Sequence, residues 1–348
     1  MARVSGLVRT GIVALSLWAA GALAPSSAQM TKDGLNPTGA NPTANSVNEE
    51  FLFKQEPKIG GRVSIPDQKS ANLIQPQGRE YRAFREDYLP WIGGIAVLGI
   101  LGLLATFFLL RGRIPLDDPG PDTGKKILRF NSFERFAHWM TATCFIILSL
   151  SGLNYIFGKR LLMPLIGPEA FGALAQWAKY AHLYLAWPFM LGIAIMLVVW
   201  VRDNIPEKLD WEWIKAGGGL VGRGHPHARR FNAGQKVVFW MVVGFGAAMS
   251  VTGLVMMFPF SVTDINGMQV TQVIHSLIGV VFIAGILAHI YIGSIGMEGA
   301  YDAMGSGKVD LGWAKSHHDL WVEEQQAKTA SGPQVGKRPV SPHQVPAE

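Results

Sequence analysis

Residues 273–291 read VIHSLIGVVFIAGILAHIY, a mostly aliphatic run that contains two histidines, His275 and His289. Fourteen positions separate these histidines, which in a helix is a rise of about 21 Å and about 40° short of four full turns. Both imidazoles would therefore lie on the same side of one helix, at two different levels. Because ionisable side chains inside hydrocarbon are costly, they usually mark a functional site.

The run belongs to one of five uncharged stretches, each long enough to cross a bilayer as a helix. These stretches are Tyr88 to Leu110, Phe136 to Gly158, Tyr180 to Val201, Val237 to Thr263 and Ile265 to Met297. Of the 348 residues, 49% are hydrophobic and only 16% are charged, against about 25% charged in soluble domains. Disorder and coiled coil need more charge, and a single cysteine excludes a disulfide scaffold. The sequence therefore predicts an all-α membrane protein.

The first 28 residues predict an export signal. Arg3 and Arg9 precede an apolar stretch, Gly11 to Ala24, and small residues then lead to a cleavage position after Ala28. As a helix the stretch would rise only about 21 Å, so a spanning anchor is the weaker alternative. Residues 29–87 are rich in Asn, Pro, Gly and charge and predict a flexible periplasmic segment, and residues 324–348 predict a disordered cytoplasmic tail.

Lysine and arginine positions predict the orientation of the spans. The links after the first and third spans are rich in these residues, which are Arg111, Arg113, Lys125, Lys126, Arg129 and Arg135, then Arg202, Lys208, Lys215, Arg223, Arg229, Arg230 and Lys236. The rich links and the C-terminus are expected in the cytoplasm, and the N-terminus after cleavage outside it. Three arginines before the first span, Arg79, Arg82 and Arg85, oppose this orientation, and the signal segment is expected to override them. Membrane topology, rather than nucleic-acid binding, accounts for the net charge of +6.

Four histidines lie within the spans, and the predicted orientation sorts them by depth. His182 and His275 fall near the outside, whereas His138 and His289 fall nearer the inside. A single histidine in a span is more often a packing residue, but two imidazoles from different helices at each of two levels are what two b-type haems require. Zinc fits less well because no thiolate or carboxylate completes its coordination shell. Copper is not strictly excluded. With both axial positions of the iron filled, the expected chemistry is one-electron transfer.

From about Lys126 to Glu323 the sequence resembles the membrane-bound cytochrome b (gamma) subunit of respiratory formate dehydrogenase. The landmarks of the resemblance are Arg135 to Trp139, Asn204 to Pro206, Phe231 to Lys236, Ile274-His275, His289 to Tyr291 and Trp313 to His318. The histidine pattern alone would also fit the cytochrome b subunits of nickel-iron hydrogenase and thiosulfate reductase. The runs at 232–236 and 313–318 favour formate dehydrogenase.

The resemblance implies a bacterial inner-membrane complex of three subunits. A molybdenum or tungsten catalytic (alpha) subunit would oxidise formate, and an iron–sulfur (beta) subunit would pass the electrons to this chain. His182 with His275 would ligate the outer haem b, and His138 with His289 the inner one. The chain would then reduce membrane quinone near the cytoplasmic face. Residues 126–323 would form this quinone-reducing domain as a four-helix dihaem core, and the helix at 88–111 would be an extra N-terminal span.

Asn232, Gly234 and Gln235 are the predicted quinone-binding residues, together with His289. Their run opens the fourth span at the depth of the inner histidines, and their side-chain and backbone amides can bond a quinone carbonyl. The alternative is that Asn232 only caps the helix.

Two other functions fit part of the pattern. One is the cytochrome b subunit of a nickel-iron hydrogenase. The other is a non-catalytic membrane anchor that docks a soluble dehydrogenase.

Overall fold

A computed structural model describes residues 78–115, 124–218 and 226–330. The predicted signal, its cleavage position, the segment from 29 to 77 and the tail after Ala330 lie outside the described residues. The described residues belong to one of two compact units.

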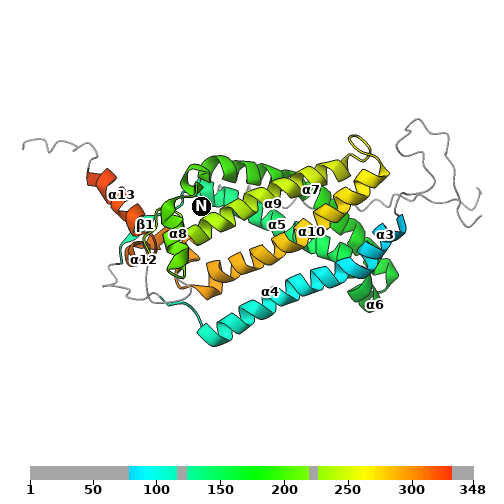
Figure 1. Cartoon of the computed structure of the whole chain (residues 1–348), viewed down its shortest axis with the longest axis horizontal. Helices are drawn as coiled ribbons and strands as arrows, with labels where there is room; N and C mark the ends of the chain where they lie inside the picture. The colour runs from blue at the N-terminus through cyan, green and yellow to red at the C-terminus, as the bar shows by residue number, and fades with distance from the viewer. Residues whose placement is uncertain (1–77, 116–123, 219–225, 331–348) are drawn as a thin grey trace, which may run out of the picture. The chain divides into compact units, whose positions relative to one another are not determined.

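Five helices in the described part are long and apolar enough to cross a membrane, which confirms the five predicted spans (Figure 1). The first runs from Gly78 to Arg111 and consists of α3 (Gly78–Ala83), the π-helical turn η2 (Phe84–Tyr88) and α4 (Leu89–Arg111). The others are α5 (Ser132–Leu161), α7 (Pro168–Trp200), α9 (Ala233–Met257) and α10 (Ile265–Tyr291), the last continued by the π-helical turn η4 (Ile292–Gly296). The membrane-spanning part of the described residues is thus a bundle of helices, as predicted for an all-α membrane protein.

Four of these helices form the core, and α4 lies outside it. α5 packs along α7, α9 packs along α10, and α7 also contacts α9. α4 packs mainly against α10, and its outward face leaves large apolar side chains such as Trp91 and Leu109 exposed in the isolated chain. Exposed apolar area of this kind is what lipid covers.

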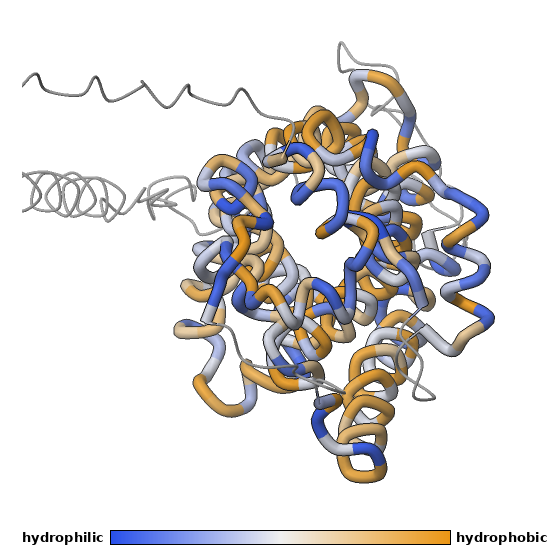
Figure 2. The backbone as a smooth tube through the Cα atoms, turned by 90° about the vertical axis from the view of Figure 1, so that its left-hand side faces the viewer, coloured by the Kyte–Doolittle hydropathy of each residue, from blue (hydrophilic) through white to orange (hydrophobic). Residues whose placement is uncertain are grey.

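A polar end closes one end of the bundle. Two short strands, β1 (Lys126–Leu128) and β2 (Lys308–Asp310), pair antiparallel with Lys126 opposite Asp310. The remaining elements of this polar end are the turn η3 (Arg202–Asn204) and helices α8 (Lys208–Lys215), α11 (Asp302–Gly305), α12 (Leu311–His317) and α13 (Asp319–Ala330). Figure 2 looks at the bundle from the side on which α8, α12 and α13 lie, and hydrophilic segments gather toward the viewer there. A further short helix, α6 (Met163–Ile166), links α5 to α7.

Two predicted boundaries are wrong in detail. Residues 78–87 are helical rather than part of a flexible segment, and they continue directly into α4. Residues 324–330 belong to α13 rather than to a disordered tail. α13 is held by Trp321 and Val322, which are buried, and by an ion pair between Glu324 and Arg229.

A buried carboxylate ties the start of α5 to the end of α7. Glu134 is 5% exposed and closes a capping box with Asn131 at the N-terminus of α5. It also accepts hydrogen bonds from Trp200 Nε1 at 2.8 Å and from Arg230 at 2.6 Å. Because removing one partner of a buried ion pair costs several kcal/mol, this contact fixes the helix ends at the polar end.

Candidate functional site

The structure brings the four span histidines together as two pairs. His182 of α7 faces His275 of α10, with ring centroids 6.3 Å apart. His138 of α5 faces His289 of α10, with centroids 6.2 Å apart. These are the pairs that the depth argument predicts. They are called here the 182–275 pair and the 138–289 pair.

Both separations match two imidazoles that hold one metal ion from opposite sides. A metal–nitrogen bond is about 2.0 Å and a ring nitrogen lies about 1.2 Å from its centroid, so such rings have centroids about 6.4 Å apart. A direct hydrogen bond between ring nitrogens would bring the centroids to within about 5.5 Å. In the described structure, no hydrogen bond joins the two rings of either pair.

Two hydroxyls fix the tautomers in the 182–275 pair. Ser151 Oγ lies 2.7 Å from His182 Nδ1, and Thr252 Oγ1 lies 2.7 Å from His275 Nδ1. Each hydroxyl also donates to a carbonyl of its own helix, Ser151 to Leu148 at 2.8 Å and Thr252 to Ala248 at 2.7 Å. A hydroxyl has one proton, so its oxygen must accept from the ring nitrogen. Both rings therefore carry their proton on Nδ1 and leave the lone pair of Nε2 for a metal.

Sequence reasoning missed Ser151 and Thr252. Each is a polar residue within an apolar span, at the depth of the histidine that it contacts. That coincidence of depth was the available signal.

The 138–289 pair lacks such partners. Nδ1 of His138 is buried and has no hydrogen-bond partner in the structure, and the ring of His289 forms no hydrogen bond with any described residue. His138 instead packs edge-on against Trp139, with centroids 5.2 Å apart. Buried polar atoms are normally satisfied, so the unpaired Nδ1 of His138 distinguishes this pair from the 182–275 pair.

A layer of four phenylalanines, one from each core helix, lies between the pairs. Phe282 is seven residues from both His275 and His289 along α10. Its ring lies 4.7 Å from Phe145 of α5 and 5.8 Å from Phe245 of α9, and Phe189 of α7 lies 6.3 Å from Phe145. This apolar layer lies between the two imidazole pairs.

Neither pair gains further protein ligands. Among the described residues, no three His, Cys, Asp or Glu side chains come close enough to hold a metal ion together. A closed zinc site needs four such ligands, whereas an iron in a porphyrin needs only two axial imidazoles. Small residues such as glycine near the pairs could let a porphyrin approach a helix. Of these glycines, Gly279 and Gly285 face methionines of α9, Met249 and Met241. Gly152 faces open space.

The predicted quinone residues form the N-terminus of α9. The Asn232 side chain accepts from Gln235 N at 3.0 Å, and the Gln235 side chain accepts from Asn232 N at 3.2 Å, so the two make a capping box. Arg129 also donates to Gln235 Oε1 at 3.3 Å. A Cβ added at Gly234 would lie 3.1 Å from the Trp213 side chain of α8, so the glycine also allows this helix to pack closely. Only the oxygens of the two side-chain amides are used by the cap.

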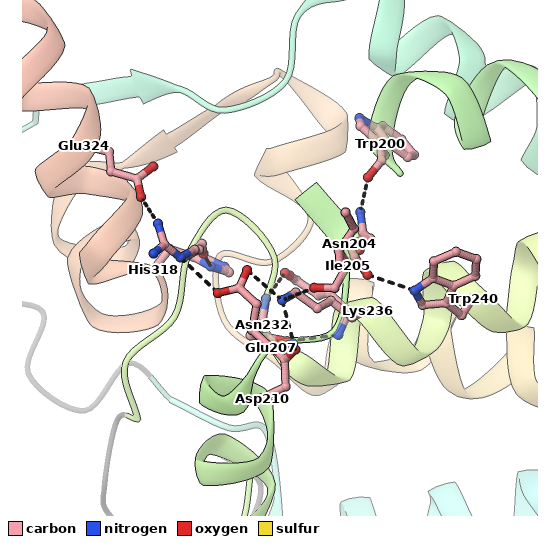
Figure 3. A network of polar contacts seen from close by, with 12 residues as sticks. Trp200, Asn204, Ile205, Glu207, Asp210, Asn232, Lys236, Trp240, His318 and Glu324 are labelled. Carbon is pink, nitrogen blue, oxygen red and sulfur yellow. Dashed lines mark hydrogen bonds and ion pairs between the residues drawn. The ribbon is translucent and has the colours of Figure 1, made fainter. Parts of the chain in front are cut away.

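Lys236 joins this helix start to another sequence landmark, the run from Asn204 to Pro206. It is 5% exposed and donates to Asp210 at 3.0 Å and to the carbonyl of Ile205 at 3.1 Å, as Figure 3 shows. The next residue back, Asn204, is fully buried and its carbonyl accepts from Trp240 Nε1 at 2.8 Å. The 204–206 and 232–236 runs are therefore parts of one polar network.

A buried cation and a buried imidazole lie behind the cap. Arg129 is 3% exposed, and its guanidinium lies over the rings of Phe130, Trp313 and Trp321. Burial, with the nearby charge of Arg230, lowers the pKa of Arg129 to about 9. His318 is fully buried and donates from Nδ1 to the Arg229 carbonyl at 2.7 Å. Burial and the charge of Arg129 lower the pKa of His318 well below its usual value, so its ring is neutral.

Comparison with known proteins identifies the family. The family model described as prokaryotic cytochrome b561 matches residues 129–307, which include both histidine pairs. The cytochrome b556(Fdn) subunit of the nitrate-inducible formate dehydrogenase of Escherichia coli K12 is 31% identical over 216 residues, 60% of this chain and 96% of the relative. The chain belongs to the prokaryotic cytochrome b561 family, among the cytochrome b subunits of formate dehydrogenase.

Other relatives of this cytochrome b agree. The cytochrome b556(fdo) subunit of an E. coli K12 formate dehydrogenase is 30% identical over 207 residues, 58% of this chain and 95% of the relative. The cytochrome b556 subunit of Haemophilus influenzae formate dehydrogenase is 28% identical over 207 residues, 58% of this chain and 84% of the relative. Membership of a cytochrome b family implies that the chain binds haem b. α4 lies outside the residues that the family model matches.

Proposed function

We propose that this chain holds two haems b and carries electrons across the membrane to quinone, as the cytochrome b subunit of a formate dehydrogenase. His182 with His275 would hold one haem, and His138 with His289 the other. The observation that carries the proposal is the geometry of these pairs, which lie on one face of α10 at two levels, each with the ring separation of a single shared metal.

Two imidazole ligands per iron determine which kind of reaction the site can support. An iron with two axial imidazoles has no open position for substrate, so the haem supplies one-electron transfer and no bond-making step. The chain's own residues hold the two sites about 21 Å apart along α10. The phenylalanine layer places apolar rings between them.

Quinone would bind between the start of α9 and the 138–289 pair, which the sequence predicts at the same depth. Because the capping box uses only the amide oxygens of Asn232 and Gln235, their NH₂ groups remain donors for a quinone carbonyl. His289 has no competing hydrogen bond, so its Nδ1–H can serve as a further donor. Capping and quinone binding by Asn232 are therefore compatible.

The partners follow from the relatives, which are subunits of formate dehydrogenases. Formate would be oxidised in a molybdenum or tungsten alpha subunit, and an iron–sulfur beta subunit would donate electrons to the 182–275 site. These relatives favour formate dehydrogenase over the hydrogenase alternative. An anchor that merely stores haem would differ from this function in one respect, because its reduced haem would not be reoxidised by quinone.

We further propose a bacterial inner-membrane location with the polar end in the cytoplasm. The described lysines and arginines in and beside β1 and α8, such as Lys126, Lys208 and Arg230, lie at this end of the bundle. The 182–275 site is then the outer one and the 138–289 site the inner one. Electrons that move inward to quinone contribute to the membrane potential, which is worth about 2.3 kcal/mol per charge per 100 mV.

Removal of one axial imidazole should release one haem only. His182→Ala and His275→Ala should each lower haem content from two per chain toward one and abolish the same spectral component, because they open the same site. His138→Ala and His289→Ala should abolish the other component. Haem content and reduced-minus-oxidised spectra of the purified complex measure this, with exposed His227→Ala as the control. Loss of the same component in His182→Ala and His138→Ala would refute the pairing.

The two roles of Asn232 can be separated by Asn232→Asp. A carboxylate still caps the helix, so thermal stability should be kept, but the NH₂ donor is lost and quinone turnover should slow at least ten-fold, the cost of about 1.4 kcal/mol for one hydrogen bond. Asn131→Asp, in the equivalent capping box of α5, is the matched control and should leave turnover unchanged. Formate-driven haem reduction should persist in both variants. Unchanged quinone turnover in Asn232→Asp would leave Asn232 as a cap alone.

Topology can be measured independently of function. A reporter enzyme that is active only outside the cytoplasm should be active when fused at Gly167 or Gly267. It should be inactive at Gly218 or Gly307, which lie at the polar end. Activity at Gly218 would invert the bundle and exchange the outer and inner sites.

A further inference from the structure

The two histidine pairs differ in the hydrogen-bond partners of their Nδ1 atoms. In the 182–275 pair both Nδ1 atoms lie 2.7 Å from a hydroxyl, that of Ser151 or that of Thr252. In the 138–289 pair, Nδ1 of His138 is buried without a partner, and His289 bonds no described side chain. The hydroxyls therefore act on one site only.

The direction of these hydrogen bonds is set by proton counting. The Ser151 hydroxyl donates its hydrogen bond to the Leu148 carbonyl, and the Thr252 hydroxyl donates its hydrogen bond to the Ala248 carbonyl. Each hydroxyl oxygen can then only accept from the imidazole. A ring that donates from Nδ1 becomes a more basic ligand at Nε2, and its orientation is held.

A more basic axial ligand stabilises the ferric state more than the ferrous state, because the ferric iron carries the greater charge. Hydrogen bonding to axial ligands is one of the means by which proteins set haem potential. The 182–275 site has this stabilisation from both of its ligands. The 138–289 site receives it from no described residue of the chain.

We infer that Ser151 and Thr252 are positioning residues that lower the reduction potential of the outer haem relative to the inner one. The inference rests on the proposed function, since it needs a haem at each pair. Through the two hydroxyls the chain makes the inward electron step more favourable, from the site near the donor subunit to the site near quinone.

The test is a redox titration of the haem absorbance in the intact complex. Thr252→Val and Ser151→Ala each remove one hydroxyl. Each should raise the midpoint potential of the outer component, which is identified as the one lost in His182→Ala, and leave the inner component in place. Loss of one such bond should change the ferric-to-ferrous preference roughly ten-fold, which is about 59 mV for one electron.

Three matched variants separate the hydroxyl from its surroundings. Thr252→Ser and Ser151→Thr keep a hydroxyl and should keep the wild-type potential. Ser250→Ala removes a hydroxyl of the same helix that bonds only the Gly246 carbonyl, and it should also have no effect.

Three results would overturn the inference. Two are unchanged potentials in Thr252→Val and Ser151→Ala with both haems bound, and equal shifts of both components. The third is release of the outer haem from both hydroxyl-free variants but from neither hydroxyl-keeping one, which would give the hydroxyls a holding role rather than a redox role. In all three cases two haem components in the wild type would leave the proposed function standing. A single component in the wild type would instead refute the proposed function.

Discussion

The arrangement of this molecule depends on two imidazoles, fourteen residues apart, on one face of a membrane-spanning helix. Ionisable side chains are costly in hydrocarbon, and each of the two faces an imidazole of another helix. The imidazole that faces His275 comes from α7, and the one that faces His289 comes from α5. The two pairs set the levels at which these helices meet α10, and Phe282 and Phe145 pack midway between the levels. α4 supplies no histidine and packs outside this arrangement.

The two ends of the bundle differ in how their polar groups are satisfied. At the 182–275 level, hydroxyls within the spans satisfy the imidazoles, and little other polar structure is required. The polar end instead joins segments far apart in sequence, as Arg129 contacts both Gln235 and the ring of Trp313. Its buried groups hold the N-terminus of α9 in place, and the side-chain NH₂ groups of Asn232 and Gln235 are not used by the cap. A rigid polar frame with unused donors is suited to a small polar headgroup.

The sequence was sufficient for the spans and for the pairing of the histidines, because both follow from hydropathy and helix periodicity. The roles of Ser151 and Thr252 could not be predicted, since a hydroxyl in a span usually bonds its own backbone and the sequence does not show which hydroxyls also contact a histidine. The polar end could not be predicted for a related reason. The pairing of β1 with β2 and the burial of Arg129 depend on contacts across about 180 residues, which local patterns do not encode. α13 was taken for a tail because its sequence is polar, although Trp321 and Val322 anchor it.

We propose that each histidine pair binds one haem iron through both imidazoles. Electron paramagnetic resonance of the oxidised, purified complex can decide this, because a ferric haem with two imidazoles is low-spin and one with an open position is high-spin. We expect two low-spin ferric haem signals per chain and no high-spin haem signal. A stoichiometric high-spin signal, or a single low-spin haem, would show that at least one pair does not bind a haem iron in this way.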